Sequence, residues 1–577
     1  MPKGCYTCRR RRIICDNRRP TCRKCHDAGK QCLGYTKPLV WVKGGVASRG
    51  KMMGLSFDDV NGQECHERSS SHSRLERNTE QQAALDQSHQ GSNDETLVHM
   101  RELSAESPSF SLVDPLFRDV AALSRFYISH FNLHCVRTLA LYDSVRNPYR
   151  ELIPYINESP VLTDSLAAIG AIHHAYMSTC DYQFPLLPVS DEIAETSALS
   201  LSRPAQSLVP FSAQPVNCKA FEHFLSLKQR ALHQLSKDVA QPATRNDDRT
   251  IAAIFVLILL DAVESGNGAW KYHLEGAKSI LRNRLLTANE YSMMTEGIST
   301  FVIDACLITE IMGSTLARPG ALSEPFYSQS MGATVLKRLE KTAWVGCPAY
   351  LLDIIFFIHA QRYSNLNQTP QNYSLSFLSS SGEATQAESP LAILRHIDAF
   401  DPYAWAEEMQ SYLLLSDSSQ KVRVALACAY KAAVYLYARR VVSKMSSFLS
   451  DCEAAGNQAP RDREIVESEL VQNLSLISPD DEHFKCTIWP TFIAGAESMY
   501  PTQRIFTLQH LNLLWNDYCS VNLHNAACVL KIMWQKQDER GRLNERRRTE
   551  LSAFALQEDE VDWIQELDQS RSDWLFI

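Results

Sequence analysis

The chain has 577 residues, of which 45% are hydrophobic, and its formal net charge is −8. This length allows a large buried core, and the acidic balance excludes a protein whose whole surface coats nucleic acid. The charge is uneven, because residues 1–50 contain 13 Lys or Arg and only two acids, which gives +11 and leaves −19 for the remainder. A small basic segment on an acidic body is typical of a protein that binds DNA through that segment.

The basic segment contains an internal repeat of cysteines with the spacing C-x2-C-x6-C-x6-C-x2-C-x6-C. Its six members are Cys5, Cys8, Cys15, Cys22, Cys25 and Cys32. Zn2+ takes four thiolate or imidazole ligands, and a C-x2-C pair can bind one ion. Two pairs indicate two ions, which need eight ligand contacts, and six thiolates supply eight only if two of them bridge both ions. The alternative is one ion with two idle cysteines.

A disulfide framework is the other interpretation of cysteines spaced this closely. However, the chain begins MPKGCYTC, without the apolar segment of a secretory signal, and the other 11 of its 17 cysteines are scattered singly. We therefore expect reduced thiols in an intracellular protein, with the six cysteines as metal ligands.

Positive charge is concentrated in the first half of the repeat, where four arginines, Arg9 to Arg12, follow Cys8. We expect a short helix starting at Cys8 to enter the major groove of DNA, where an arginine can donate two hydrogen bonds to guanine O6 and N7. Neighbouring arginines would contact phosphates and set the register. Other interpretations of this run are a nuclear-import signal or a counter-charge for an anionic metal cluster.

With this spacing and charge, residues 1–40 resemble the binuclear zinc cluster of the fungal Zn2Cys6 transcription factors. The resemblance implies that Cys5 and Cys22 bridge two Zn2+ ions. It also implies that Cys8 and Cys15 complete one site and that Cys25 and Cys32 complete the other.

The same resemblance assigns roles in DNA binding. It implies that Arg11 and Arg12 contact a CGG-type triplet and that Arg9 contacts phosphate. Ile14 departs from the family, which usually has a basic residue before the third cysteine, and another arginine could replace that contact. The predicted DNA-binding residues are Arg9, Arg10, Arg11, Arg12, Arg18 and Arg19.

Residues 41–110 are predicted to form a flexible linker. Only seven of residues 61–110 are Val, Ile, Leu, Met, Phe, Trp or Tyr, which is too little apolar surface to offset the entropy of ordering the chain. No sustained heptad pattern follows the cysteines, so the sequence does not predict a zipper dimer and leaves the oligomeric state open.

Residues 111–553 are predicted to form a large all-α region. Leu162, Leu166, Ile169 and Ile172 follow a helical period. Residues 251–260 are ten consecutive apolar residues, too few to span a bilayer, and predict a buried core helix. Residues 422–437 predict a third helix, and polar or proline-bearing breaks near 184–218 and 363–392 predict loops.

Three motifs give this region a second resemblance, to the fungal-specific transcription factor domain of the second type. They are Asn147-Pro148-Tyr149-Arg150, the W-x-x-H-x-x-G-A sequence from Trp270 to Ala277, and Trp489-Pro490 followed by Gly495-Ala496-Glu497. The resemblance implies a regulatory role, in which the region binds partners or a small-molecule effector.

An enzyme is the alternative from another class, but no catalytic residues are predicted. Neither Asp247-Asp248 nor Asp480-Asp481 forms the DDxxD of a terpene cyclase, and the chain has no H-E-x-x-H, G-x-S-x-G or P-loop motif. His173-His174 lies beside an apolar stripe, and we expect core histidines there. His273 is likewise expected to serve in packing or capping.

The C-terminal segment, residues 554–577, mixes acids with bulky apolar residues. Residues 558–577 contain seven acids and one base, interleaved with Trp563, Leu567, Trp574, Leu575 and Phe576. This pattern is typical of a disordered activation segment that binds transcriptional coactivators. The alternative is a last helix that docks on the core through Trp563 and Leu567.

Together these features predict a nuclear, zinc-dependent, sequence-specific DNA-binding regulator of RNA polymerase II transcription that acts as an activator. The predicted partners are two Zn2+ ions, double-stranded DNA and coactivators, with no membrane association. The alternatives are a transcriptional repressor, and a zinc-dependent scaffold whose helical region carries the main function.

Overall fold

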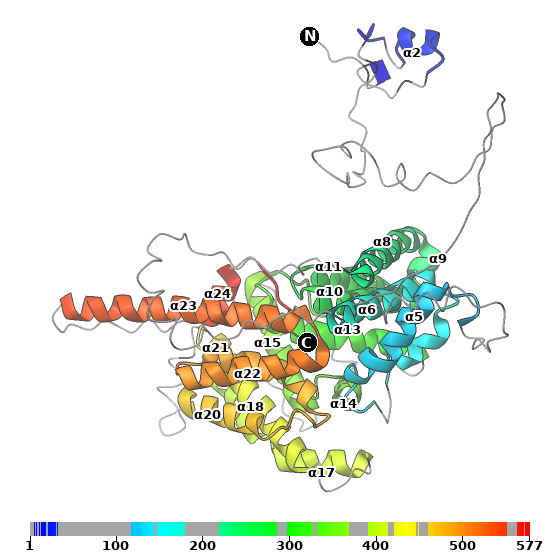
Figure 1. Ribbon diagram of the computed structural model, residues 1–577. Helices are drawn as coiled ribbons and strands as arrows, with labels where there is room; N and C mark the ends of the chain where they lie inside the picture. The colour runs from blue at the N-terminus through cyan, green and yellow to red at the C-terminus, as the bar shows by residue number, and fades with distance from the viewer. Residues whose placement is uncertain are drawn as a thin grey trace, which may run out of the picture. The chain divides into compact units, whose positions relative to one another are not determined.

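The chain divides into two compact units, Met1–Ser107 and Pro108–Ile577, in the computed structural model (Figure 1). In the first unit the structure describes residues 5, 7–8, 11, 13–18, 21–30 and 32. In the second it describes residues 117–143, 147–178, 218–285, 297–326, 332–367, 375, 390–413, 420–445, 448, 460–550, 562–569 and 572–576. The predicted linker, residues 41–110, and most of the two predicted loops lie outside the described residues.

The described part of the first unit is built around one short helix, α2 (Arg23–Asp27). Cys22 is its N-cap, and the Cys22 sulfur accepts a hydrogen bond from the backbone N–H of Cys25. The Asp16 carboxylate accepts from the backbone N–H groups of Arg23 and Lys24, at 3.0 and 3.4 Å. Asp16 therefore satisfies N–H groups of the first turn that have no partner inside the helix.

The described part of the second unit is all-α, which confirms the predicted fold class. Its described β-structure consists of two isolated β-bridges. Its α-helices are α5 (Ala122–His130), α6 (Pro160–Met177), α8 (Lys219–Ala240), α9 (Pro242–Arg245), α10 (Asp248–Glu264), α11 (Ala269–Leu285), α13 (Gly297–Leu316), α14 (Gly332–Thr342), α15 (Ala349–Asn367), α16 (Pro390–Ala399), α17 (Pro402–Leu413), α18 (Gln420–Val442), α20 (Arg463–Ser475), α21 (Ile488–Glu497), α22 (Pro501–Tyr518), α23 (Val521–Glu550) and α24 (Trp563–Gln569). Shorter turns are η2 (Phe131–Cys135), η3 (Val136–Thr138), η4 (Arg150–Tyr155) and η9 (Phe484–Thr487).

Two groups of helices pack around central members in which more than half of the residues are buried. In the first group α10 and α6 contact each other, and α5, α8, α11 and α13 pack against them. In the second group α18 contacts α15, α16, α17, α20 and α21, and Figure 1 shows α17, α18 and α20 of this group in yellow to orange-yellow. The three helices predicted from the apolar residues are thus the central ones.

Local sequence explains where the central helices begin. Asp247 caps α10, because its Oδ1 accepts a hydrogen bond from the backbone N–H of Arg249 at 2.8 Å. Ser159 caps α6, and Pro160 stands at its first position, where a missing N–H costs nothing. The apolar residues 251–260 of α10 are all buried, as the sequence predicted. Of the described helices, α13 has the length and apolar composition of a membrane span, and most of it is buried inside this core.

The motif Asn147-Pro148-Tyr149-Arg150 holds the π-helical turn η2, which continues α5. The Arg150 Nη1 atom donates to the carbonyl oxygen of Asn132 at 2.9 Å and to its Oδ1 at 2.7 Å. The Asn147 side-chain amide donates to the carbonyl oxygen of Val136 at 2.8 Å. Because a π-helix is rare and its longer i→i+5 bonds are less favourable than α-helical ones, these side chains supply partners that keep the turn in place.

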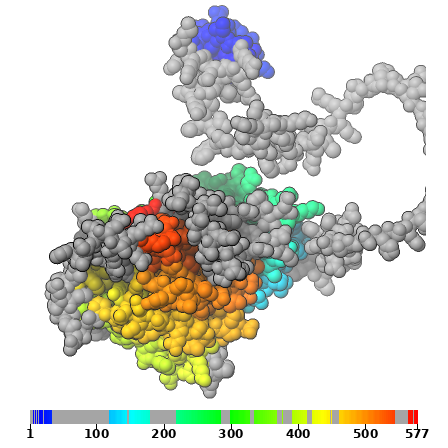
Figure 2. Space-filling view, turned by 60° about the vertical axis from the view of Figure 1, so that its left-hand side comes forward, coloured from blue at the N-terminus to red at the C-terminus, as the bar shows by residue number. Residues whose placement is uncertain are grey.

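The C-terminal segment is docked on the helical unit in its described residues, which is the second of the two predicted alternatives. Trp563, Leu567, Trp574 and Phe576 are all at most 2% exposed. The Trp563 indole N–H donates to the Glu497 carboxylate at 2.7 Å. Figure 2 shows the red surface of this segment against the orange surface of the preceding helices.

The acids of this segment pair with bases of the helical unit. Asp573 is buried and accepts from the guanidinium of Arg318 at 3.0 and 2.9 Å, and it also pairs with Lys271. Glu566 pairs with Lys536 and Arg540 of α23. The acidic composition that resembles an activation segment therefore also provides the charges for docking.

We expect Trp574→Ala to lower the free energy of unfolding of the second unit by about 3–5 kcal/mol, the usual cost of truncating a buried tryptophan. The Trp574 side chain is 1% exposed, whereas that of Tyr403 in α17 is 69% exposed. Tyr403→Ala is thus the matched control and should change stability by less than about 0.5 kcal/mol. Urea denaturation of both variants measures the difference, and equal stabilities would contradict the docked arrangement.

Candidate metal centre and nucleic-acid interface

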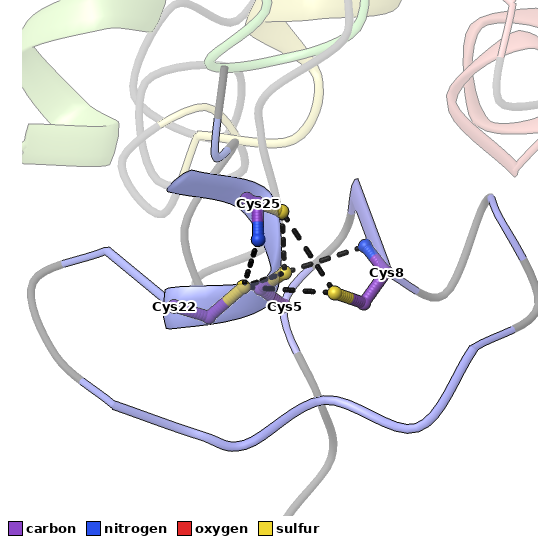
Figure 3. Close-up of side chains that lie close together, drawn as sticks. All are labelled: Cys5, Cys8, Cys22 and Cys25. Atoms are coloured by element: carbon purple, nitrogen blue, oxygen red, sulfur yellow. Dashed lines mark hydrogen bonds between the residues drawn. The ribbon is translucent and has the colours of Figure 1, made fainter. Parts of the chain in front are cut away.

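Four cysteine sulfur atoms of the first unit converge on one point (Figure 3). The Sγ of Cys5 lies 3.5 Å from that of Cys22 and 3.7 Å from that of Cys25. The Sγ of Cys8 lies 3.6 and 3.8 Å from the same two atoms. A tetrahedral Zn2+ with Zn–S bonds of about 2.3 Å has S–S edges of about 3.8 Å. The four sulfurs therefore fit a tetrahedral zinc site.

The sequence repeat of 17 residues is also a repeat in structure. The backbone N–H of Cys8 donates to the Cys5 sulfur and that of Cys25 to the Cys22 sulfur, each at 3.3 Å. After each pair the chain makes the same turn, because the N–H groups of Ile13 and Lys30 bond the carbonyls of Cys8 and Cys25. Each half thus presents two sulfurs from one turn of backbone, as a C-x2-C metal ligand pair requires.

The remaining two predicted ligands lie beside these four. Cys15 and Cys32 are partly buried and pack against the cluster. Cys15 forms a second potential ligand set with Asp16 and Cys22, and the ligand atoms of these three residues all lie within 4.8 Å of one another. Cys22 therefore belongs to both sets, which is the position that a bridging thiolate would take. All six predicted ligands come together. The structure gathers Cys8 and Cys25 in one set, whereas the resemblance implies that they complete different sites, and of the two implied bridging cysteines only Cys22 belongs to both described sets. The division of the six cysteines between two ions therefore stays a prediction.

Burial disfavours ionised thiols in this cluster when no cation is present. It raises the pKa of Cys5 to about 12 and also raises the pKa values of Cys8 and Cys22. Because zinc binds the thiolate, metal binding must displace these protons and becomes stronger as the pH rises. Without a metal these three cysteines are therefore held as neutral thiols.

The predicted DNA-binding arginines are only partly within the described residues. Arg11 and Arg18 are described, and both are exposed. The N–H of Arg11 bonds the carbonyl of Thr7 at 3.1 Å, which places Arg11 at the end of the turn that contains Cys8. Ile14 is also exposed, at 84%. Arg9, Arg10, Arg12 and Arg19 lie outside the described residues.

In three of the four acids of the pairs Asp247-Asp248 and Asp480-Asp481, the carboxylate has a structural role, as a helix cap or as the partner of a basic side chain. Asp247 caps α10 and pairs with Arg249, whereas Asp248 pairs with Arg284. Asp481 accepts from the backbone N–H of His483 and contacts its ring.

Sequence reasoning missed the surroundings of His173. This side chain is buried, as expected of a core histidine, but its Nδ1 lies 3.0 Å from the Nε2 of His130. The two residues are 43 positions apart, so no local spacing signals their contact.

Family models match both units of the chain. The model of the fungal Zn(2)-Cys(6) binuclear cluster domain matches residues 3–41. The model of the fungal specific transcription factor domain matches residues 125–577, which is more than half of the chain. The chain belongs to this family. It is a fungal transcription regulator whose zinc cluster domain binds two Zn2+ ions and DNA, and its family implies a nuclear location.

A search of characterised proteins gives relatives of the same kind. The acriflavine sensitivity control protein acr-2 of Neurospora crassa is 23% identical over 641 aligned residues, which cover 100% of this chain and 97% of that protein. The white-opaque regulator 2 of Candida albicans is 62% identical over 32 residues, which cover 6% of this chain and 7% of that protein. An aspercryptin biosynthesis cluster-specific transcription regulator of Emericella nidulans is 58% identical over 33 residues, covering 6% of this chain and 5% of its own. No solved structure matches significantly.

We expect residues 1–50 to bind two Zn2+ ions and to lose their fold on chelation, because metal binding supplies the folding free energy of so small a unit. Cys22→Ser should cost more zinc affinity than Cys15→Ser, since a bridging ligand serves both ions. Native mass spectrometry of the three proteins gives the stoichiometry directly. One ion per wild-type chain, or a fold that survives the chelator, would contradict the binuclear centre.

Proposed function

We propose that this protein is an activator of RNA polymerase II transcription that reads CGG-type triplets in the major groove through Arg11 and Arg12. The observation that carries the proposal is the gathering of six cysteines in a basic segment in which two predicted DNA-binding residues, Arg11 and Arg18, are exposed. A rigid metal centre would fix the direction of the adjacent turn, and a fixed turn can present arginines to base edges.

The proposed organisation follows the charge and the helices along the chain. Residues 1–40 would form the DNA-binding domain, residues 41–110 a linker, residues 111–553 the regulatory domain and residues 554–577 the tail. The net +11 of residues 1–50 supports electrostatic attraction to phosphates, while the acidic remainder would not bind DNA by itself.

If Arg12 reads a guanine, Arg12→Ala should weaken binding to a CGG-containing duplex by about 1–3 kcal/mol and relax the preference at that position. If Arg9 holds phosphate, Arg9→Ala should weaken all sequences alike and reduce the slope of log K against log salt by about one. Fluorescence titrations of the full chain on CGG-containing and scrambled duplexes measure both effects.

Arg23 provides the control for these variants, because it is an exposed arginine of α2 that pairs with Asp27 and is not a predicted contact. Arg23→Ala should leave the sequence preference unchanged. An equal loss on both duplexes for Arg12→Ala would assign Arg12 to phosphate. No specific duplex binding by the wild type would favour the alternative function, a zinc-dependent scaffold.

We further propose that residues 554–577 recruit a coactivator when the helical unit does not cover them. In a fusion to an unrelated DNA-binding domain these aromatic side chains have no core to pack on. The fusion should therefore activate a reporter, and Trp563→Ala with Trp574→Ala should abolish activation, since aromatic burial supplies most of the energy of helix-in-groove binding. A silent wild-type fusion would contradict the activation segment, and repression by the full chain would identify a repressor.

A small-molecule effector belongs to the same proposal. A cavity of about 640 Å³ lies between α15, α18 and α24, within the range of ligand pockets. Its lining combines apolar side chains such as Met445 and Ile564 with the charged side chains of Arg362, Lys444 and Asp568. Because α24 forms one wall, a ligand there would also contact the C-terminal segment.

A further inference from the structure

Three potential metal ligands of the second unit converge where α5 and η2 meet α6. The ligand atoms of His130, Cys135 and His173 all lie within 4.8 Å of one another. The two imidazole nitrogens, His130 Nε2 and His173 Nδ1, are 3.0 Å apart. Tetrahedral zinc with Zn–N bonds of about 2.0–2.1 Å separates its nitrogen ligands by about 3.3 Å. Small side-chain movements would therefore fit the three ligands around one ion.

The π-helical turn η2 is what places two of these ligands together. In a regular α-helix, with 3.6 residues per turn, positions i and i+5 lie about 140° apart around the axis. In η2 the N–H of Val136 bonds the carbonyl of Phe131, which is an i→i+5 bond. This wider turn brings residues that are five positions apart onto nearly the same side of the helix. His130 and Cys135 are five positions apart. Such turns occur frequently at functional sites.

The backbone of this turn is held from outside the cluster. Arg150 bonds the carbonyl and side chain of Asn132, and Asn147 bonds the carbonyl of Val136. Both belong to the motif that marks the family. The turn is thus stabilised by side chains that are not themselves ligands, which is how a preorganised site is built.

Further imidazoles surround the three ligands. The His134 ring centroid lies 4.5 Å and the His174 ring centroid 5.1 Å from that of His130. His134 is exposed, so it can reach a metal from the solvent side.

We propose that His130, Cys135 and His173 form a zinc site in the helical unit, separate from the cysteine cluster of the first unit. Imidazole and thiolate together favour Zn2+ or copper over Mg2+ and Ca2+, and tetrahedral zinc suits three protein ligands with a fourth position open. His134 or a solvent molecule fills that position. Bound zinc ties the α5–η2 segment to α6, so the stability of this end of the helical unit depends on the zinc concentration.

Metal counting on the full chain tests the site. Native mass spectrometry should find three zinc ions per wild-type chain, and two after His130→Gln with Cys135→Ser. Two control variants, the exposed His233→Gln of α8 and the thiol Cys528→Ser of α23, should keep three. Zinc should also raise the melting temperature of the helical unit in the wild type and in both controls, but not in the double variant. Two ions in the wild type, or loss of the third in a control, would overturn the proposal.

A spectroscopic measurement does not depend on whether the double variant folds. In the full chain with all six cysteines of the first unit changed to serine, Co2+ should bind one ion per chain with a thiolate-to-cobalt charge-transfer band. Adding Cys135→Ser should remove that band, whereas adding Cys528→Ser should not. A cobalt spectrum without the band, or no bound cobalt, would show that the cluster is only a set of packed histidines.

Discussion

Two buried carboxylates, Glu497 and Asp573, hold the end of the chain to the helical unit. Glu497 is 1% exposed and accepts from the Trp563 indole and, at two 2.8 Å contacts, from the Arg440 guanidinium. Asp573 binds Arg318 and Lys271 and is equally buried. Carboxylates at this depth are stable only with complete partners, because removing one partner leaves an uncompensated buried charge. The last residues are therefore part of the core of this unit.

Two of the family motifs contact the docked C-terminal segment. Trp270 begins one motif, and its indole N–H donates to the carbonyl of Asp573 at 2.9 Å, while Glu497 ends another. Beside Trp270, Gly266 has φ +66°, and the N–H of Leu575 bonds its carbonyl at 3.1 Å. A side chain at Gly266 would be strained by this φ and would approach Asn522. Both motifs thus contact the docked C-terminal segment, Trp270 across 303 residues of sequence and Glu497 across 66.

The sequence predicted what depends on local pattern. A helical period located α6, a run of ten apolar residues located α10 and an apolar composition located α18, while cysteine spacing located the ligands that the structure gathers. Docking of the tail was not decided, because alternating acids and aromatics suit both a solvated segment and one whose acids meet bases from distant helices. The π-helical turn has no sequence period of its own, and its stabilising partners in the Asn147 motif follow 11 and 18 residues after the groups that they bind. His130 and His173 meet only because α5 packs on α6.

The two units obtain their folding free energy from different sources. The buried side chains in the described part of the first unit are cysteines, with Cys5, Cys8, Cys22 and Cys25 fully covered. Four thiols exclude too little apolar surface to offset the entropy of ordering even a short chain, so this unit must gain its stability from metal coordination. The helical unit buries one large apolar cluster that includes residues from Val120 to Phe576, so its folding free energy comes mainly from apolar burial. A fall in free zinc would therefore unfold the DNA-binding unit while the helical unit keeps its apolar core.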